Sequence, residues 1–248
     1  MQCKILILGS GSSIGVPSIG CKCSVCMSQS FKNKRLRPSA LIYIDGKKFL
    51  IDVSPDIRSM ALSHNIDNID AIFLTHPHED HSGGMNDLRP YYLIEQKKIP
   101  VILSQHTYDV LRVRFDYLID RFDMHIISNL TGNETICGVE YKYFTYSQGD
   151  VPVNGFRFND FVYITDIKNY SVELFNELIG VKTLILSLNH EHGSNMHFSL
   201  EEAICFIESV SPEKCYFTHI SHSIDHDNLN FKLPIGIELA YDGLIIYV

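Results

Sequence analysis

Residues 71–84, read as AIFLTHPHEDHSGG, constrain this chain more than any other segment. An apolar run of strand type leads directly into four side chains that commonly bind metals, and a glycine pair then ends the segment: His76, His78, Asp80 and His81. Side chains two residues apart on an extended backbone point to the same side, so His76 and His78 can bind one ion. Asp80 and His81 follow as the chain turns and can face a second ion. A polar loop with histidines clustered by chance is disfavoured, because nothing would offset the cost of bringing these titratable groups together. The segment predicts a metal site.

Composition sets broader limits. With 248 residues, 45% of them hydrophobic and 20% charged, the chain is long enough for a full core in one large domain or two small ones. The net charge of −8 argues against broad nucleic-acid binding, whereas a single phosphate ester is acceptable where bound cations offset that charge. The opening residues contain no signal peptide or transmembrane run, and the seven cysteines then indicate a reducing compartment. We expect a cytoplasmic protein without a membrane partner.

A second candidate metal site lies in GCKCSVC, a cysteine-rich loop at residues 20–27. Cys21, Cys23 and Cys26 are close enough to bind one tetrahedral ion, which needs one further ligand. A structural zinc is favoured over free thiols, because the intervening Lys22 and Ser24 do not suit burial as small apolar residues. Spacing leaves the fourth ligand open among Cys3, Cys215 and a distant histidine.

Ligand-type side chains also occur where other apolar strands end. Asp52 closes the second strand of a hairpin predicted at 39–52, and it can be a metal ligand, a partner that orients a ligand histidine, or a helix cap. We favour the partner role. Asp166 ends the strand in FRFNDFVYITD, which alone is a weak sign of a ligand. Further histidines follow two later strands: His190, His192 and His197, then His219, His222 and His226. An α/β scaffold that gathers a site at one edge of its sheets is expected from this pattern.

Three further local predictions concern the scaffold. Ser199 is expected to cap a helix, with Glu202 completing a capping box. Residues 106–122 are predicted to carry a further helix. The basic run KNKRLR at 32–37 is interpreted as a solvated loop in preference to a substrate contact.

Several motifs together are specific enough to identify a family. THPHEDH (75–81), Asp166 and THISH (218–222) resemble the metallo-β-lactamase-fold hydrolases. Within them, GSGSSIGVPSIGCKCSVC (9–26), LIDVSPDIR (50–58), GFRFNDFVYITD (155–166) and MHFSLEEA (196–203) resemble the branch that contains PhnP, the phosphodiesterase of the carbon–phosphorus lyase pathway, which acts on phosphoribosyl cyclic phosphate. The resemblance covers nearly the whole chain, which implies a single domain over residues 1–248.

The resemblance implies an α/β fold, an αβ/βα sandwich of two mixed sheets flanked by helices, with two divalent metals (zinc or manganese) between the sheets. It assigns roles position by position: His76 and His78 to the first metal, Asp80, His81 and His219 to the second, and Asp166 bridging both. Asp80 and His197 are the candidate catalytic residues, His197 as general acid. His222 matches the fourth ligand of a structural zinc with Cys21, Cys23 and Cys26.

This chain departs from the family at one ligand. The family has a third histidine for the first metal in a segment resembling HGxxPVxG, whereas this chain has QGDVPVNG at 148–155. Gln148 therefore occupies the histidine position. An amide oxygen is a poorer zinc ligand than imidazole, so the first site should be weaker or shifted toward manganese or magnesium. His190 or His192 could substitute, although nothing in the sequence shows it.

The function predicted from these residues is metal-dependent hydrolysis of small phosphate diesters, including cyclic ones, by water that the metal pair activates. One alternative is a tRNA-processing nuclease, which the acidic charge and the lack of a long RNA-binding insertion disfavour. Another is a metal-stabilised binding protein with reduced or lost catalysis because of Gln148. The expected partner is a small phosphodiester substrate, with no stable nucleic-acid partner, and a homodimer is compatible with the family.

Overall fold

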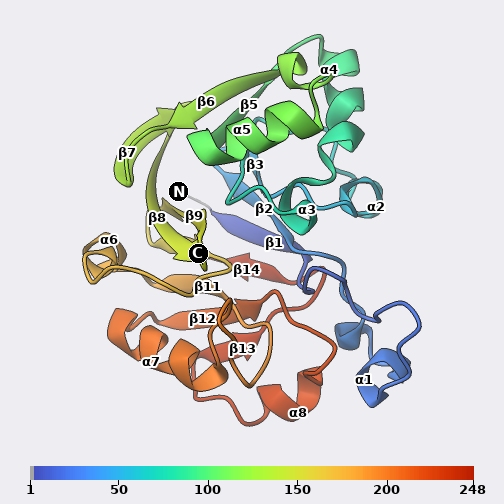
Figure 1. Ribbon diagram of the computed structural model, residues 1–248, viewed down its shortest axis with the longest axis vertical. Helices are drawn as coiled ribbons and strands as arrows, with labels where there is room; N and C mark the ends of the chain where they lie inside the picture. Colours follow the sequence, from blue (N-terminus) through green and yellow to red (C-terminus); the bar gives the residue numbers. More distant parts are fainter. Residues whose placement is uncertain (1–2) are drawn as a thin grey trace.

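Two seven-stranded sheets form the centre of the molecule in a computed structural model that describes residues 3–248 (Figure 1). The first sheet has the order β14 (Ile245–Tyr247), β1 (Lys4–Gly9), β2 (Ser39–Ile44), β3 (Lys47–Ile51), β4 (Ala71–Phe73), β5 (Ile99–Ser104) and β6 (Phe122–Ile127). The second has the order β13 (Ile237–Leu239), β12 (Lys214–Thr218), β11 (Thr183–Ser187), β10 (Phe161–Ile164), β9 (Val151–Phe158), β8 (Val139–Gln148) and β7 (Thr131–Ile136). Each sheet contains both antiparallel and parallel pairs.

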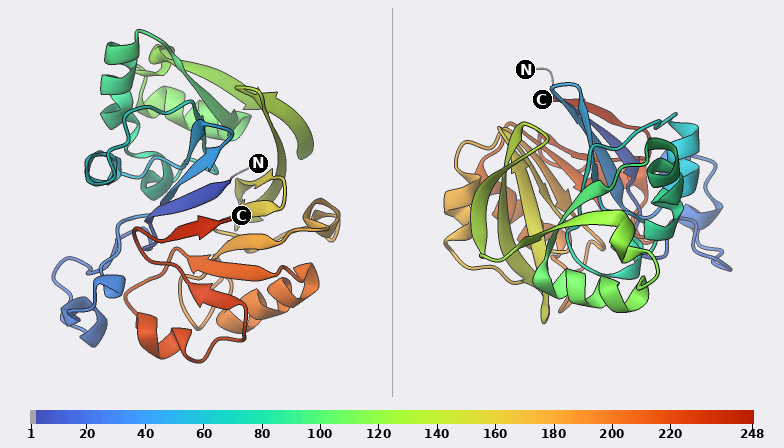
Figure 2. Two further views of the ribbon diagram at one scale, coloured as in Figure 1. Left: turned by 180° about the vertical axis from the view of Figure 1, so that it is seen from behind. Right: turned by 90° about the horizontal axis from the view of Figure 1, so that it is seen from above.

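Helices cover the outer face of each sheet (Figures 1 and 2). On the first sheet these are α2 (Ile57–Ser63), α4 (Arg89–Glu95) and α5 (Gln105–Arg114), with the 3₁₀ turns η2 (Met85–Leu88) and η3 (Ile119–Arg121). On the second they are α6 (Leu174–Leu178), α7 (Leu200–Val210) and α8 (His226–Asn230). The short α1 (Ser24–Met27) and η1 (Phe31–Asn33) lie in the loop between β1 and β2, and α3 (Glu79–Ser82) follows β4. The predicted sandwich of two mixed sheets flanked by helices is confirmed.

Strand alternation explains how one sequence fills three layers of core. In β3, Phe49 and Ile51 pack between the two sheets, while Leu50 between them faces the helices on the other side. Phe73 of the first sheet meets Phe156 and Phe158 of the second, with ring centroids 5.1 Å apart in both pairs. Edge-to-face aromatic packing of this kind fixes the two sheets against each other.

The site predicted from sequence lies where strands of both sheets end. β3 and β4 run parallel in the first sheet, and β10, β11 and β12 run parallel in the second, so their carboxyl ends point to one edge. Asp52, Asp166 and His219 follow three of these strands closely and adopt left-handed backbone, with φ of 59°, 53° and 61°. Non-glycine residues rarely adopt this conformation, and such strain is concentrated at functional sites.

The local predictions for α7 and α5 had different outcomes. The Ser199 cap and the Glu202 capping box at the start of α7 are confirmed. The helix expected within 106–122 is present as α5, but it ends at Arg114 and does not extend to Phe122. Phe115 and Leu118 beyond this point are buried in the core under the first sheet, and the chain turns to place them there.

The basic run at 32–37 is not uniformly solvated, contrary to expectation. Arg35 is only 3% exposed. Its Nη1 donates to Ser10 Oγ (2.7 Å) and to the carbonyl oxygen of Ala240 (2.6 Å), and its Nη2 lies 2.9 Å from His226 Nδ1. Burial lowers the pKa of Arg35 to about 10, so it stays charged at neutral pH. Arg35 thereby joins the end of β1 to the C-terminal part of the chain.

We expect Arg35→Met to lower the free energy of unfolding by about 3 kcal/mol, because it leaves several buried polar partners of the guanidinium unsatisfied. The midpoint of denaturant unfolding measures this loss. Arg112→Met, at an exposed position on α5, is the matched control and should change stability by less than about 0.5 kcal/mol. Equal midpoints for the two variants would contradict a structural role for Arg35.

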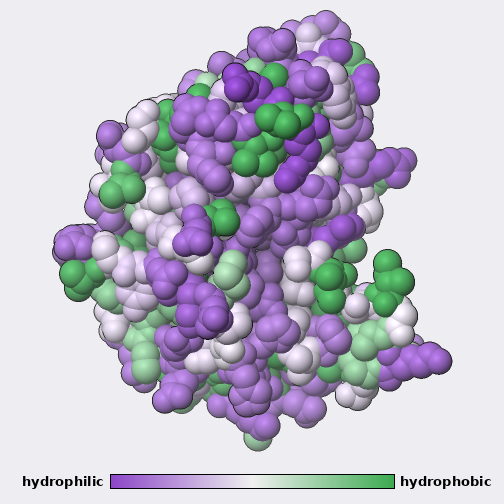
Figure 3. All heavy atoms as spheres, in the orientation of Figure 1, coloured by the Kyte–Doolittle hydropathy of each residue, from purple (hydrophilic) through white to green (hydrophobic). Residues whose placement is uncertain are grey.

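The outer surface gives fewer clues to function. On the face shown in Figure 3, hydrophobic side chains gather in small separate groups within a mainly hydrophilic surface. Within residues 3–248, no helix combines the length and the apolar character needed to cross a membrane.

Candidate metal centre

The motif after β4 folds into a tight loop that carries four of the predicted ligands. The hydroxyl of Ser82 donates to the carbonyl oxygens of Pro77 (3.0 Å) and His78 (2.9 Å), which closes the loop over the first turn of α3. His76 Nε2 lies 3.0 Å from His78 Nδ1 as a result. The two imidazoles are therefore adjacent, as strand alternation predicts for ligands of one ion.

A second group of ligand atoms comes partly from this loop and partly from the residue that follows β12. Asp80 Oδ2 lies 3.2 Å from His81 Nε2 and 3.2 Å from His219 Nε2. All three side chains are buried, and their ligand atoms lie within 4.8 Å of one another. This separation suits three ligands around one cation.

Asp166 lies between the two groups. Its Oδ2 is 3.1 Å from His81 Nε2, and its Oδ1 is 3.5 Å from His219 Nε2. It also forms a compact set with His76 and His81. Thr165 donates its hydroxyl to Asp166 Oδ2 (2.7 Å), and the Asp166 backbone N–H donates to Ser187 Oγ (2.8 Å). The structure thus brings the six residues of the predicted two-metal set together, with Asp166 central.

The chemistry of this set fits divalent cations. His81 Nε2 is buried and has no hydrogen-bond partner, although it faces two carboxylates. Burial, reinforced by His81, lowers the pKa of His76 well below its ordinary value, which leaves the neutral imidazole that metals bind. Burial alone would raise the pKa of Asp80 and Asp166, but the neighbouring histidines outweigh it and keep both as carboxylates. The centre therefore offers buried negative charge for a cation to offset.

Asp52 orients one of these ligands, as predicted. Its Oδ2 lies 2.6 Å from His81 Nδ1, which directs His81 Nε2 toward Asp80 and Asp166. Asp52 is fully buried and also accepts hydrogen bonds from the backbone N–H (2.9 Å) and the hydroxyl of Thr75. The predicted contact between Asp52 and a histidine of the motif is present, and that histidine, His81, is itself a predicted ligand.

We expect Asp52→Asn to lower the affinity of the centre for Mn²⁺ or Zn²⁺ by about 10- to 100-fold, because a carboxylate that orients a ligand histidine also raises its basicity. Competition with a chelator of known affinity measures this change. Asp120→Asn, at an exposed aspartate, is the control and should bind as the unaltered protein does. An unchanged affinity in Asp52→Asn would show that His81 is oriented by other contacts.

Gln148 and His197 line the same centre beside Asp166. Gln148 ends β8 and is buried; its Nε2 donates to Asp166 Oδ1 (2.8 Å) and lies 3.2 Å from His197 Nε2. Gln148 Oε1 and His197 Nδ1 are buried without hydrogen-bond partners. Burial lowers the pKa of His197 to about 4, so this imidazole is neutral at physiological pH.

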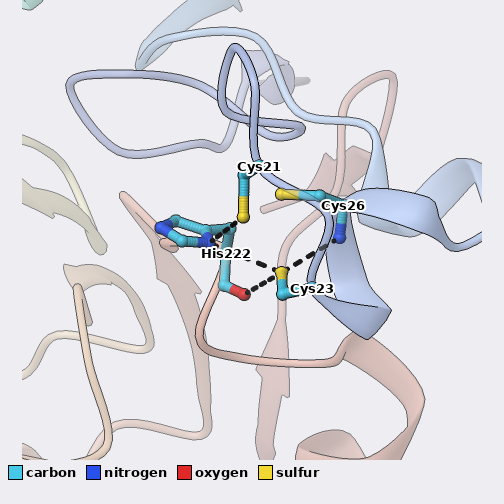
Figure 4. A group of neighbouring side chains, drawn as sticks. All are labelled: Cys21, Cys23, Cys26 and His222. Atoms are coloured by element: carbon cyan, nitrogen blue, oxygen red, sulfur yellow. Dashed lines mark hydrogen bonds between the residues drawn. The ribbon is translucent and has the colours of Figure 1, made fainter.

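The cysteine loop meets the segment that follows β12 (Figure 4). Cys21 and Cys23 each place Sγ 3.5 Å from His222 Nδ1, and Cys26 completes a set whose ligand atoms lie within 4.8 Å of one another. Hydrogen bonding to His222 lowers the pKa of Cys23 to about 6, which favours the thiolate that binds zinc. Spacing left the fourth candidate ligand open, and in the structure His222 is the residue that lies with the three thiols.

The other candidates lie elsewhere. Cys3 and Cys215 are buried in the hydrophobic core. His190 contacts the hydroxyls of Ser221 and Ser223, both at 2.9 Å, and no set of grouped ligand atoms within residues 3–248 includes His190, His192 or His226.

One contact of the centre was missed. Asn189 Nδ2 lies 3.2 Å from His219 Nδ1. Its position just after the apolar strand β11 was the available signal, but the histidines that follow obscured it.

Comparison with known proteins places this chain in a family. Residues 47–220 match the model of the β-lactamase superfamily domain. A diphosphatase from the PhnP family has a solved structure that is 35% identical, with a TM-score of 0.95, and the match covers 100% of this chain and 98% of that one.

Two curated relatives differ in how much of their length is matched. An octanoyltransferase of Porphyromonas gingivalis is 32% identical over 255 residues; the match covers 98% of this chain but 51% of that protein, so this chain spans about half its length. The anti-Pycsar protein Apyc1 of Paenibacillus harenae is 27% identical over 213 residues, which cover 79% of this chain and 88% of that protein.

The extent of the family match and the near-complete structural overlap agree with the fold and with the grouped histidines and aspartates. Both support what the motifs at 75–81 and 218–222 indicated. The chain belongs to the β-lactamase superfamily and is a PhnP-like, metal-dependent hydrolase of the metallo-β-lactamase fold.

Proposed function

We propose that this protein is a phosphodiesterase that hydrolyses small phosphate diesters, including cyclic ones, at a centre of two divalent cations. The observation that carries the proposal is the position of Asp166, between a group containing His76 and a group containing Asp80 and His219. One carboxylate shared between two cation positions is the arrangement of two-metal hydrolytic sites, in which both oxygens of an in-line displacement at phosphorus are stabilised.

The residues divide the work of the centre. In this proposal His76 and His78 hold the first cation, Asp80, His81 and His219 hold the second, and Asp166 contacts both. Asp52 fixes His81, and Asn189 contacts the far side of His219. Divalent cations bound here supply the Lewis acidity that makes water nucleophilic near neutral pH and offsets charge on the phosphate.

His197 is proposed to face the leaving group. Gln148 Nε2 is a donor, so His197 Nε2 accepts, and the single proton of the neutral imidazole is then assigned to Nδ1. Nδ1 is buried, without a hydrogen-bond partner, 3.5 Å from Asp166 Oδ1, and the low pKa of His197 keeps the ring neutral there. In this proposal its N–H donates a hydrogen bond to an oxygen of a phosphate held beside Asp166. Transfer of a proton from His197 to the departing oxygen requires the imidazolium form, because a neutral imidazole that gave up its only proton would become an imidazolate. Unless His197 is first protonated, the departing oxygen takes its proton from water.

The small-substrate proposal rests on charge. A net charge of −8 opposes extended contact with a polyanion, whereas two bound cations would offset the single charge of a diester. A tRNA-processing nuclease is therefore the weaker candidate. Loss of catalysis is disfavoured as well, because Asp80, His197 and their partners are all assembled in the centre.

The test is hydrolysis of bis(p-nitrophenyl) phosphate and of a ribose cyclic phosphate by protein loaded with Mn²⁺ or Zn²⁺. We expect turnover of both diesters, loss of turnover on chelation, and loss in Asp80→Asn. Cleavage of a tRNA precursor without turnover of either small diester would favour the nuclease. Inactivity toward all three substrates in fully metal-loaded protein would refute the phosphodiesterase proposal.

Three further proposals concern the structural zinc, the domain organisation and the cellular location. We propose one structural zinc at Cys21, Cys23, Cys26 and His222, supported by their grouped ligand atoms. We propose that residues 1–248 act as one domain, since the core between the sheets draws on strands from both halves of the chain. A cytoplasmic location is proposed because all seven cysteines are free.

A further inference from the structure

We infer that Gln148 is itself a ligand of the first cation, through Oε1, and that it makes this position selective for a harder cation such as Mn²⁺ over Zn²⁺. This inference rests on the proposed metal centre and deepens it. It depends on three features of the structure: the orientation of the amide, the burial of its oxygen, and the donor set that results.

The orientation of the Gln148 amide is fixed by its neighbours. Nitrogen and oxygen of an amide are distinguished by their hydrogen-bond partners, and only the nitrogen can donate to a carboxylate. Nε2 lies 2.8 Å from Asp166 Oδ1 and 3.2 Å from His197 Nε2. The reverse orientation would set Oε1 against the carboxylate of Asp166, so Oε1 is the end of the amide that remains free.

That free oxygen is buried without a partner. Gln148 is only 4% exposed, and Oε1 receives no hydrogen bond. A buried carbonyl oxygen without a partner destabilises the protein unless a donor or a cation meets it. Oε1 belongs to the amide that contacts Asp166, the residue shared by the two cation positions, and a cation at the first position would satisfy it.

The resulting donor set differs from that of a histidine at this position. His76 and His78 contribute two nitrogens, while Gln148 and Asp166 contribute two oxygens. The second position also has two nitrogen donors, from His81 and His219, and two oxygen donors, from Asp80 and Asp166. Oxygen donors suit Mn²⁺ and Mg²⁺, whereas imidazole favours Zn²⁺, so a neutral oxygen in place of a third nitrogen lowers the preference for zinc.

The Gln148 amide can also bind the cation and hydrogen-bond to Asp166 and His197 at the same time. While Oε1 binds the cation, Nε2 still donates to Asp166 and to His197. Occupancy of the first position therefore holds the amide in the orientation that fixes the His197 ring. Gln148 is in this sense both a ligand and a positioning residue.

The test measures binding of Mn²⁺ in the absence of substrate. The electron paramagnetic resonance signal of the free ion reports how much Mn²⁺ remains unbound. Protein that keeps its structural zinc but has an empty catalytic centre is titrated with Mn²⁺, and with Zn²⁺ in competition. We expect Gln148→Ala to weaken the first-position affinity for Mn²⁺ at least tenfold, and Gln148→Glu to retain it. Gln148→His should raise the ratio of Zn²⁺ to Mn²⁺ affinity at least tenfold. Gln105→Ala, at an exposed glutamine, is the control.

Unchanged Mn²⁺ affinity in Gln148→Ala would overturn the inference, and a loss of affinity in His197→Ala would then assign the ligand to His197. An unchanged metal preference in Gln148→His would overturn the selectivity. If Gln148→Ala does not fold, Gln148→Glu and Gln148→His carry the same test. Because no substrate is present, these results are independent of whether the protein hydrolyses diesters.

Discussion

Asp166→Asn is expected to lower kcat/KM for diester hydrolysis at least about a thousandfold. Asp166 is the carboxylate assigned to both proposed cation positions, and it lies beside His81 and His219 and forms a grouped set with His76. Asparagine keeps its shape but removes the charge and half of its ligand capacity, so both positions lose affinity. Several kcal/mol of transition-state stabilisation come from the cations, and each 1.36 kcal/mol corresponds to a factor of ten.

The measurement compares rates of bis(p-nitrophenyl) phosphate hydrolysis with metal content per chain in the same samples. Asp160→Asn is the matched control, because Asp160 lies in the turn between β9 and β10 of the same hairpin and pairs with Lys182 at the surface. We expect its rate to stay within twofold of the unaltered protein. An Asp166→Asn variant that keeps two catalytic cations and full activity would contradict the bridging role.

Cys23→Ser is expected to remove one zinc per chain and to lower the melting temperature by roughly 10 °C. The cysteine cluster ties the loop that contains α1 to the segment after β12, through the contacts of Cys21 and Cys23 with His222. Without zinc these contacts cannot hold the loop in place. Because zinc binds only the folded site, losing several kcal/mol of binding energy lowers the free energy of unfolding by a similar amount. Since His219 belongs to the same segment, catalytic metal affinity should fall as well.

Cys205→Ser provides the control, because Cys205 is exposed on α7, away from both sites. It should keep its zinc and its melting temperature. Elemental analysis and thermal unfolding of the two variants measure the effect. A Cys23→Ser variant with the full zinc content would exclude Cys23 as a ligand.

The cluster of candidate metal ligands could be predicted from sequence because its members stand at strand ends. The motif after β4 places its ligands within six residues, and the period of an extended chain decides which of them share a side. Asp166 and His219 follow apolar strands that any α/β sheet would align at one edge. Their identity as ligands nevertheless came from family resemblance, since a lone aspartate after a strand is a weak signal.

The contacts that sequence analysis missed depend on long-range packing. Arg35 stands in a basic run that is typical of a solvated loop, yet Ser10, Ala240 and His226 converge on it from distant parts of the chain. Similarly, α5 ends where Phe115 and Leu118 must enter the core, and no helix-breaking residue marks that point. Local composition does not encode such partners.

The most direct test of the two-cation centre is a titration of activity against bound metal. Protein that retains the zinc proposed at the cysteine cluster but has no metal in the catalytic centre is loaded stepwise with Mn²⁺, and the rate of bis(p-nitrophenyl) phosphate hydrolysis is measured at each step. We predict no activity before loading and a plateau only when two further cations are bound per chain. Activity in the metal-free catalytic centre, or a plateau after a single cation, would contradict the account.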